Sequence, residues 1–490
     1  MHEAMFTPSL QELRAYASEG FCRIPIACEI YSDVRTPIEV VRILKQTSKH
    51  CFMLESAESN RQWGRYTFIG GTPSMEITLR DGVLIIDEEE QDASDPLEAI
   101  RAVLRSRRAP RIPELPPFAG GLVGYFSYDF LKYSEPSLTL DAPDDESFND
   151  VDLMLFETVI VFDAYRQKIV LIGNVDASDV DASYARTRRE LEELAELICT
   201  GVPITNTHGR RSSEFRTLFD EKAYCDIVSR AQEHIREGDI FQVVLSNRLD
   251  ADFEGSLLDC YRVLRAMNPS PYMFYFSSES IELAGASPET LVQLQDGTVS
   301  TFPLAGTRAR GATDEKDAAL EAELLADEKE LAEHNMLVDL GRNDVGRVSE
   351  FGSVRVENYH QVLKFSHVMH IGSTVRGKLR DECDALDALS AVLPAGTLSG
   401  APKIRATQII NDLEQCKRGV YGGAIGYIDL SGNMDTCIAI RLAFARGGRV
   451  FVRSGAGIVA DSVPENENRE CINKAAAVVE ALRIAEGGLQ

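Results

Sequence analysis

The chain has 490 residues, 44% of them hydrophobic, with a net charge of −26 at pH 7 and a pI near 4.8. This charge argues against nucleic acid or an anionic membrane as the main partner, although local cations can still bind a small anion. No N-terminal apolar core or apolar run of 18 residues is present, so neither a signal peptide nor a membrane span is expected. The ten cysteines have no CxxC spacing, which is typical of reduced thiols and predicts a cytoplasmic protein.

Short helices and strands alternate in the first 200 residues. Hydrophobic periodicity predicts helices over 10–20, 37–44, 96–107 and 182–199, and strands over 21–30, 65–68 and 120–125. It also predicts a hairpin over 75–86, turned at residues 81–82, and two strands over 153–172, joined at residues 163–165. Residues 201–215 have no such periodicity and contain glycine, proline and serine, which predicts a linker. We therefore expect an N-terminal domain of residues 1–205 and a second domain of residues 216–490.

Longer elements follow in the second half. The pattern predicts helices over 221–237, 256–267 and 314–341, and strands over 239–250, 272–276, 281–295, 299–303, 422–430, 435–445 and 450–454. Antiparallel runs of strands with helices packed outside them predict an α+β fold and not a doubly wound parallel sheet.

Two expected helices each carry a pair of glutamates three residues apart. These are Glu330 and Glu333, and then Glu467 and Glu470, with Lys474 on the same face as the second pair. Four facing carboxylates repel one another unless a divalent cation lies between them, and ligands that are all oxygen suit Mg²⁺. Each pair is also ordinary on a solvent-exposed helix, so both interpretations stay open.

Three further patterns indicate an anionic ligand. The Gly455-Ala456-Gly457 turn lets a ligand approach the backbone closely. Arg441 shares its expected strand face with small residues, which leaves room for a carboxylate partner or for a structural ion pair. The loop 396–403, GTLSGAPK, lacks the spacing of a nucleotide phosphate loop but can hold a carboxylate at a helix start.

Together, the motifs resemble the chorismate-utilising enzymes, and within them the component I subunits of anthranilate synthase. The blocks are PLAGTRARG (303–311), DEKELAEHNMLVDLGRND (327–344), FSHVMH (365–370), PAGTLSGAPK (394–403), RGVYGGAIGY (418–427), GNMDTCIAIR (432–441) and GAGIVADSVPENENRE (455–470). This resemblance covers nearly the whole chain. It implies two large, mostly antiparallel β-sheets that form a sandwich wrapped by helices, with the active site between them.

The resemblance also implies roles for individual residues. Mg²⁺ would be held by Glu333 and Glu470, with Glu330 and Glu467 beside them. Glu289 would protonate the departing C4 hydroxyl, and His370 would serve the elimination of pyruvate. The other implied catalytic residues are Gln242, Thr397 and Lys474. The implied chorismate contacts are Gly306, Thr307, Tyr421, Arg441, Gly455, Ala456 and Gly457.

Two positions separate the related activities. Family members that add water carry lysine at the position of Gln242, and aminodeoxychorismate synthases of the lysine-nucleophile type carry it at the position of Ala305. The resemblance therefore implies direct attack of ammonia on chorismate C2, with anthranilate as the product. No segment resembles a glutaminase, which implies a glutamine amidotransferase subunit as partner in a hetero-oligomer, or free ammonia.

A tryptophan feedback site is implied as well. Residues 53–56, MLES, and 268–273, NPSPYM, resemble its two walls. The implied site residues are Glu55, Ser56, Pro271, Tyr272, Met273, Ile425 and Tyr427. The alternative interpretations are component I of an aminodeoxychorismate synthase and a catalytically inactive homologue that senses tryptophan.

Overall fold

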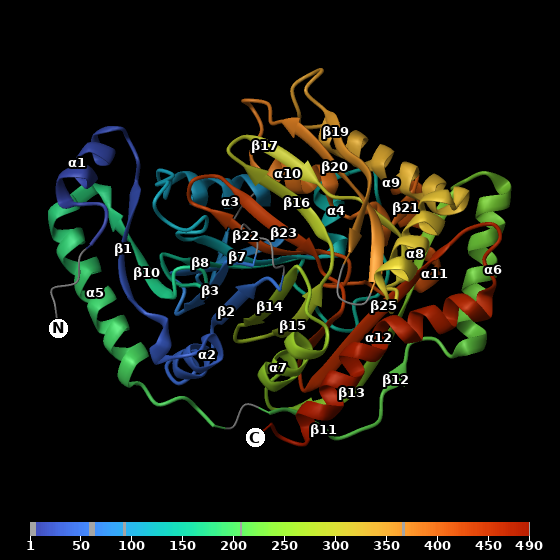
Figure 1. The fold of residues 1–490 in the computed structure, drawn as a ribbon, viewed down its shortest axis with the longest axis horizontal. Helices are drawn as coiled ribbons and strands as arrows, with labels where there is room; N and C mark the ends of the chain where they lie inside the picture. Colours follow the sequence, from blue (N-terminus) through green and yellow to red (C-terminus); the bar gives the residue numbers. More distant parts are fainter. Residues whose placement is uncertain (1–5, 58–63, 92–94, 206–207, 365–367, 490) are drawn as a thin grey trace.

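Two large antiparallel sheets dominate the computed structural model, which describes residues 6–57, 64–91, 95–205, 208–364 and 368–489 (Figure 1). Within these ranges the first sheet has thirteen strands. Its path is β1 (Arg23–Tyr31), β10 (Lys168–Asp176), β9 (Thr158–Asp163), β3 (Tyr66–Gly71), β2 (Cys51–Glu55), β14 (Tyr272–Ser277), β15 (Glu282–Ser287), β24 (Leu442–Arg446), β25 (Arg449–Ile458), β13 (Gln242–Glu254) and β11 (Arg210–Arg211), while β12 (Arg216–Thr217) and β21 (Gly400–Ala401) also pair with β13.

The second sheet has twelve strands among the described residues. Its path is β18 (Leu304–Ala309), β20 (Val368–Lys378), β17 (Thr298–Thr301), β16 (Thr290–Gln295), β23 (Met434–Ile438), β22 (Ala424–Asp429), β7 (Gly121–Phe126), β8 (Val151–Phe156), β4 (Met75–Arg80), β5 (Val83–Ile86) and β6 (Glu89–Gln91), and β19 (Arg355–Lys364) pairs with β20.

Helices cover the outer faces of both sheets. They are α1 (Leu10–Ser18), α2 (Pro37–Leu44), α3 (Pro96–Arg105), α4 (Leu131–Ser134), α5 (Val180–Thr200), α6 (Glu221–Glu237), α7 (Leu258–Met267), α8 (Asp314–Ala326), α9 (Glu328–Gly346), α10 (Ala385–Val392), α11 (Lys403–Glu414) and α12 (Pro464–Glu486), with 3-10 turns η1 (Ser32–Val34), η2 (Tyr128–Phe130), η3 (Ala177–Asp179) and η4 (Gly396–Leu398). Buried apolar residues of α1, α2, α5, α7 and α12 pack on the first sheet. Those of α3, α9 and α10 pack on the second.

An aromatic core holds the inner faces of the two sheets together. Phe52 of β2 packs against Phe156 of β8, with ring centroids 4.6 Å apart and the ring planes at 67° to each other. Around them, Val161, Phe274 and Leu442 of the first sheet meet residues of β7 and β8 from the second. Edge-to-face aromatic pairs add to the stability that burial of their area provides. The predicted α+β fold with two antiparallel sheets is confirmed.

One predicted strand, 435–445, is wrong in an informative way. The segment is two strands, β23 in the second sheet and β24 in the first, joined by a crossover at residues 439–441. Arg441, at the end of the crossover, has a φ of 51°. This left-handed conformation is unfavourable for a residue with a side chain, and it accompanies the change of sheet.

The predicted long helix over 314–341 is also divided in two. It breaks at Asp327, whose ψ of 103° is extended and whose side chain accepts hydrogen bonds from the backbone N–H groups of Lys329 and Glu330. The aspartate therefore caps α9 and places Glu330 in its first turn.

The expected domain boundary lies in the segment between α5 and β12. Strands from both sides of this segment join the same sheets, because β2 pairs with β14 and β7 pairs with β22. The division into domains at residues 205 and 216 therefore stays a prediction. Within the described residues, no helix is long and apolar enough to cross a membrane.

A buried ion pair joins β13, α11 and the turn η4. Glu414 and Arg418 are 1% and 2% exposed, and the Arg418 side chain donates to both carboxylate oxygens and to the carbonyls of Leu398 and Val244. Ser246 donates to the same carboxylate through its backbone N–H and its hydroxyl. Burial alone would raise the pKa of Glu414, but Arg418 and these hydrogen bonds lower it.

Replacing Glu414 with glutamine is expected to destabilise the protein by about 3–5 kcal/mol, because the arginine charge stays buried without its partner. The measurement is the midpoint of urea unfolding. Glu480→Gln is the control, since its ion pair with Arg483 is exposed and should matter little. Equal effects of the two substitutions would contradict this role for Glu414.

Candidate active site

A cavity of about 500 Å³ lies between α9, α12, β18, β25 and the crossover at residues 439–441. Its lining includes every residue predicted for the metal, substrate and catalytic roles except Ala456. Ile440, next to Arg441, lines the cavity too. The sequence blocks therefore converge on one site, although they are spread over more than 200 residues of the chain.

Ala456 is the exception because side chains alternate along a strand. Its methyl group is fully buried in a cluster with Leu245 and Ile458, on the far side of β25 from the cavity. Its neighbours Gly455 and Gly457 face the cavity. A Cβ atom on Gly455 would lie 3.0 Å from the Tyr421 hydroxyl, so a larger residue there would crowd the site. The predicted substrate contact of Ala456 is therefore limited to its backbone.

The two predicted acidic helix faces meet at this cavity. Desolvation raises the pKa of Glu333, and the carboxylates of Glu330 and Glu470 raise it further. The pKa of Glu467 is also raised by desolvation and by Glu470. Glu333 and Glu470 lie on different helices, so this repulsion acts across the cavity. Such mutual repulsion is what a bound divalent cation relieves.

Cations already balance part of this negative charge. Lys474 Nζ lies 2.7 Å from Glu470 Oε1 and donates to the Gly455 carbonyl at 3.1 Å. Arg308 lies 3.2 Å from Glu330, so this glutamate is already paired. Lys329, which sequence reasoning missed, lines the cavity and lowers the pKa of Glu333. Its position beside Glu330, at the start of α9, was the available signal.

The tightest grouping of potential metal ligands in the described part of the chain lies elsewhere. Ligand atoms of His234, Glu237 and Asp239 lie within 4.8 Å of one another at the end of α6. Asp239 is, however, already bonded to His234 at 2.8 Å and to Arg405 at 2.7 Å. This cluster is therefore an ion-pair network, and the cavity glutamates stay the predicted metal ligands.

Glu289 has the protonation chemistry of a general acid. It lies between β15 and β16, and Thr397 Oγ1 donates to its carboxylate at 3.1 Å. Burial raises the pKa of Glu289 to about 7, against the opposing effects of Thr397, Lys474 and Arg441. A carboxyl group with this pKa is partly protonated near neutral pH and can donate a proton.

His370 lies in β20, opposite β18. Its Nδ1 atom is 2.9 Å from the Gly306 carbonyl and 3.1 Å from the Thr307 hydroxyl. Because a carbonyl only accepts hydrogen bonds, we assign the ring proton to Nδ1, which leaves Nε2 as the basic nitrogen. Burial lowers the pKa of His370, so the ring is neutral at physiological pH.

The crossover presents Arg441 to the same cavity. No hydrogen bond or ion pair joins its guanidinium to another residue in the described ranges, and burial lowers its pKa, with Glu289 acting against this. A partly buried guanidinium of this kind is suited to a carboxylate ligand. The alternative interpretation, a structural ion pair, would require a carboxylate partner for Arg441, and the described residues supply none.

A second pocket lies between the sheets and is lined by all seven residues predicted for tryptophan. The segments 53–56 and 268–273 come together because β2 pairs with β14, with Glu55 opposite Met273. The Glu55 carboxylate, however, already binds Arg265 and Tyr261 of α7. This carboxylate is therefore not available to bind the ammonium group of an amino acid such as tryptophan, and Glu55 contributes to the pocket through its backbone.

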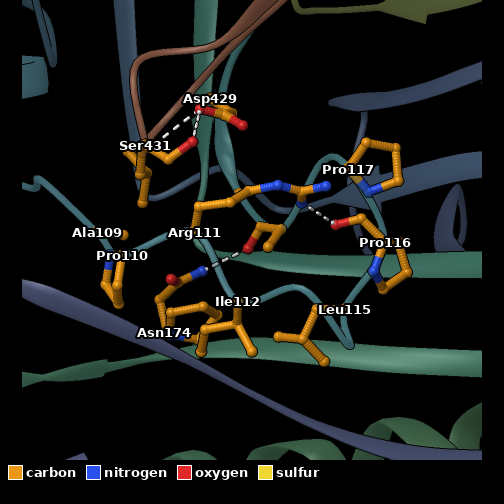
Figure 2. A pocket seen from close by; sticks show the side chains of 14 residues that line it. Ala109, Pro110, Arg111, Ile112, Leu115, Pro116, Pro117, Asn174, Asp429 and Ser431 are labelled. Atoms are coloured by element: carbon orange, nitrogen blue, oxygen red, sulfur yellow. Dashed lines mark hydrogen bonds between the residues drawn. The ribbon is translucent and has the colours of Figure 1, made fainter. Parts of the chain in front are cut away.

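One residue of this pocket's lining, Pro117, comes from the loop 109–120, which was not predicted. Figure 2 shows this loop where it lines another pocket, with Arg111 donating to the Pro116 carbonyl at 3.1 Å. The Asn174 amide donates to the Ala119 carbonyl of the same loop at 2.8 Å. These bonds brace Pro117, which lines the second pocket. Asp435 on the pocket floor was missed as well, since one aspartate in a strand gives no sequence signal.

Comparison with known proteins places the chain in a class. Residues 49–480 match the family described as chorismate binding enzyme, and the chain belongs to this family. Among its relatives, the anthranilate synthase component 1 proteins of Acetivibrio thermocellus and Aquifex aeolicus are 42% and 44% identical to it over 98% of the chain, covering 99% and 98% of theirs. The resemblance found in the sequence is therefore confirmed.

Solved structures agree with this assignment. The crystal structure of anthranilate synthase component I from Streptococcus pneumoniae has a TM-score of 0.77 and 39% identity, covering 92% of this chain and 98% of that one. MenF, the menaquinone-specific isochorismate synthase of Escherichia coli, has a TM-score of 0.69 at 22% identity, covering 97% of this chain and 99% of its own. The second similarity concerns the fold alone.

The raised pKa of Glu289 predicts the pH dependence of catalysis. An acid must be protonated to act, so kcat/KM for chorismate, at constant free ammonia, should fall as pH rises through about 7. Well above this pH the fall should approach about tenfold per pH unit. Glu289→Gln should abolish turnover and keep chorismate binding. A flat profile between about pH 6 and pH 9 would contradict an acid role.

Proposed function

We propose that this chain is the synthase subunit that converts chorismate and ammonia into anthranilate, pyruvate and water. The observation that carries the proposal is the convergence of Arg441, Glu289, His370 and the two acidic helix faces on one cavity. This set can bind a dicarboxylate, protonate a leaving hydroxyl and remove a ring proton. The names of the component 1 relatives agree with this activity.

Two regions of the cavity would bind chorismate. Arg441 would bind the carboxylate of the enolpyruvyl group, because its guanidinium faces the cavity. Tyr421 and the backbone of Gly455–Gly457 would contact the rest of the substrate, with Gly306 and Thr307 at the opposite wall. The other carboxylate, on the ring, would then point toward the acidic helix faces, where it requires a cation.

Mg²⁺ fits the donor set of those faces. Glu333 and Glu470 would hold the ion, with Glu467 and Glu330 beside them, although Glu470 is paired with Lys474 and Glu330 with Arg308. When bound, the ion would supply the positive charge that lets carboxylates of protein and substrate lie together. Lys474 and Lys329 supply part of that charge from the protein itself.

Ammonia would add directly to C2 of the ring. Gln242 and Ala305 both line the cavity, and neither side chain is a base or a covalent nucleophile. As the C2–N bond forms, both ring double bonds shift and the C4 hydroxyl leaves with the proton of Glu289, as water. The added nitrogen then loses one proton, which restores the acid form of Glu289. His370 Nε2 would then take the C2 proton while pyruvate departs and the ring becomes aromatic.

A separate glutamine amidotransferase subunit would supply the ammonia in a hetero-oligomer, as the component 1 names of the relatives suggest. The second pocket would bind tryptophan as a feedback inhibitor, with Pro271, Tyr272 and Met273 against the indole. We propose a cytoplasmic location because the ten cysteines have no CxxC spacing, which is typical of reduced thiols.

The decisive experiment uses the purified chain with chorismate, Mg²⁺ and ammonium. Mass spectrometry and fluorescence should identify anthranilate, together with an equal amount of pyruvate. Glutamine in place of ammonium should give no product without a partner subunit. Formation of aminodeoxychorismate, or no consumption of chorismate, would contradict the proposal.

Removing one metal ligand should abolish turnover and leave the fold intact. Glu470→Gln keeps the size of the side chain, and the carboxylate lies at the cavity and not in the core. A loss of activity of about 100-fold or more is expected, since metal binding and catalysis both depend on it. Excess EDTA should have the same effect on the parent enzyme. Glu480→Gln, on the outer surface of α12, is the matched control.

A further inference from the structure

A polar network lies on the floor of the second pocket. The Tyr272 hydroxyl donates to Asp435 Oδ1 at 2.9 Å, and the Gln293 amide donates to the same two groups at 3.1 and 3.2 Å. The Thr290 hydroxyl lies 3.0 Å from the Tyr272 oxygen. Tyr272 and Asp435 line the second pocket, so its occupant would meet this network directly.

The same network adjoins the active-site cavity. Thr290 follows Glu289 in the chain and begins β16. The Ile438 N–H donates to the Glu289 carbonyl at 3.0 Å, and the pairing of β16 with β23 shifts register between Thr290 and Val292. Asp435 and Cys437 of β23 line the second pocket, whereas Arg441, three residues beyond this strand, lines the cavity.

We propose that the hydrogen bond between Thr290 and Tyr272 positions Glu289, and that a ligand in the second pocket acts on catalysis by changing this bond. Thr290 and Tyr272 are positioning residues in this account, because neither side chain takes part in the reaction. The inference deepens the proposed feedback function and rests on it.

Hydrogen-bond capacity explains why the network responds to a ligand. A tyrosine hydroxyl has one proton, which here goes to Asp435, so it accepts from Thr290. A ligand that donates to Asp435 or displaces the Tyr272 ring would redirect that proton and weaken the bond to Thr290. The irregular pairing next to Thr290 lets the strand start move without breaking the rest of β16.

The coupling also has a thermodynamic requirement. A ligand shifts an equilibrium only by its different affinities for the two states. In this account the ligand favours the state in which the Thr290 bond is broken and Glu289 is displaced. If the bond is removed by mutation, the two states no longer differ at this contact, so the ligand still binds but loses its effect on turnover.

Thr290→Val tests the proposal in the full chain, with ammonium as nucleophile and L-tryptophan as ligand. Valine keeps the shape of threonine and removes the hydroxyl. We expect kcat to fall about fivefold with little change in the KM for chorismate, as for one lost hydrogen bond. The dissociation constant of tryptophan, from calorimetry, should fall by about twofold to tenfold, because the ligand no longer has to break this bond, while inhibition at saturating tryptophan weakens about tenfold or more.

Thr436→Val is the matched control. Thr436 is 3% exposed, lies on β23 and donates to the Val292 carbonyl at 2.8 Å, outside the network. It should be inhibited like the parent, and a loss of inhibition here as well would overturn the proposal. Full inhibition of Thr290→Val by tryptophan, or loss of tryptophan binding by this variant, would also overturn the proposal. If tryptophan does not inhibit the parent, the feedback function itself fails, and the coupling with it.

Discussion

The passage of the chain from one sheet to the other at residues 439–441 is the constraint on which the site depends. β23 ends in the second sheet and β24 begins in the first, so the residues between them must cross the interior of the sandwich. The crossover places Arg441 in a left-handed conformation and directs its charge into a cavity between packed layers. A continuous strand would have placed the arginine on one sheet face.

Charge balance then determines what the cavity can hold. Five glutamates, two lysines and two arginines line a single space, and burial together with neighbouring carboxylates raises the pKa values of Glu333 and Glu467. Such a site favours a ligand that brings a divalent cation together with its own carboxylates. An acidic protein can therefore recognise an anionic substrate, because the local arrangement and not the net charge decides binding.

The two pockets are linked because they share structural elements. β23 contributes to the floor of the second pocket and leads into the crossover, and β16 begins beside Glu289. Ligands bound at the two sites would therefore adjoin the same pair of strands. Close packing between the sheets, as between Phe52 and Phe156, limits how far one element moves without the other.

The sequence by itself determined the fold class, the two acidic helix faces and the glycine turn at 455–457, because local periodicity and contiguous motifs carry this information. The family resemblance implied the predicted residues of both pockets. Only the tertiary structure decided which charges meet. It alone placed Arg265 on Glu55, Arg308 on Glu330 and Asp435 beneath the second pocket. The crossover was missed for the same reason, since alternation along 435–445 is identical whether one sheet or two receive the strand. Burial of Glu289, and hence its pKa, likewise arises from contacts among segments distant in the chain.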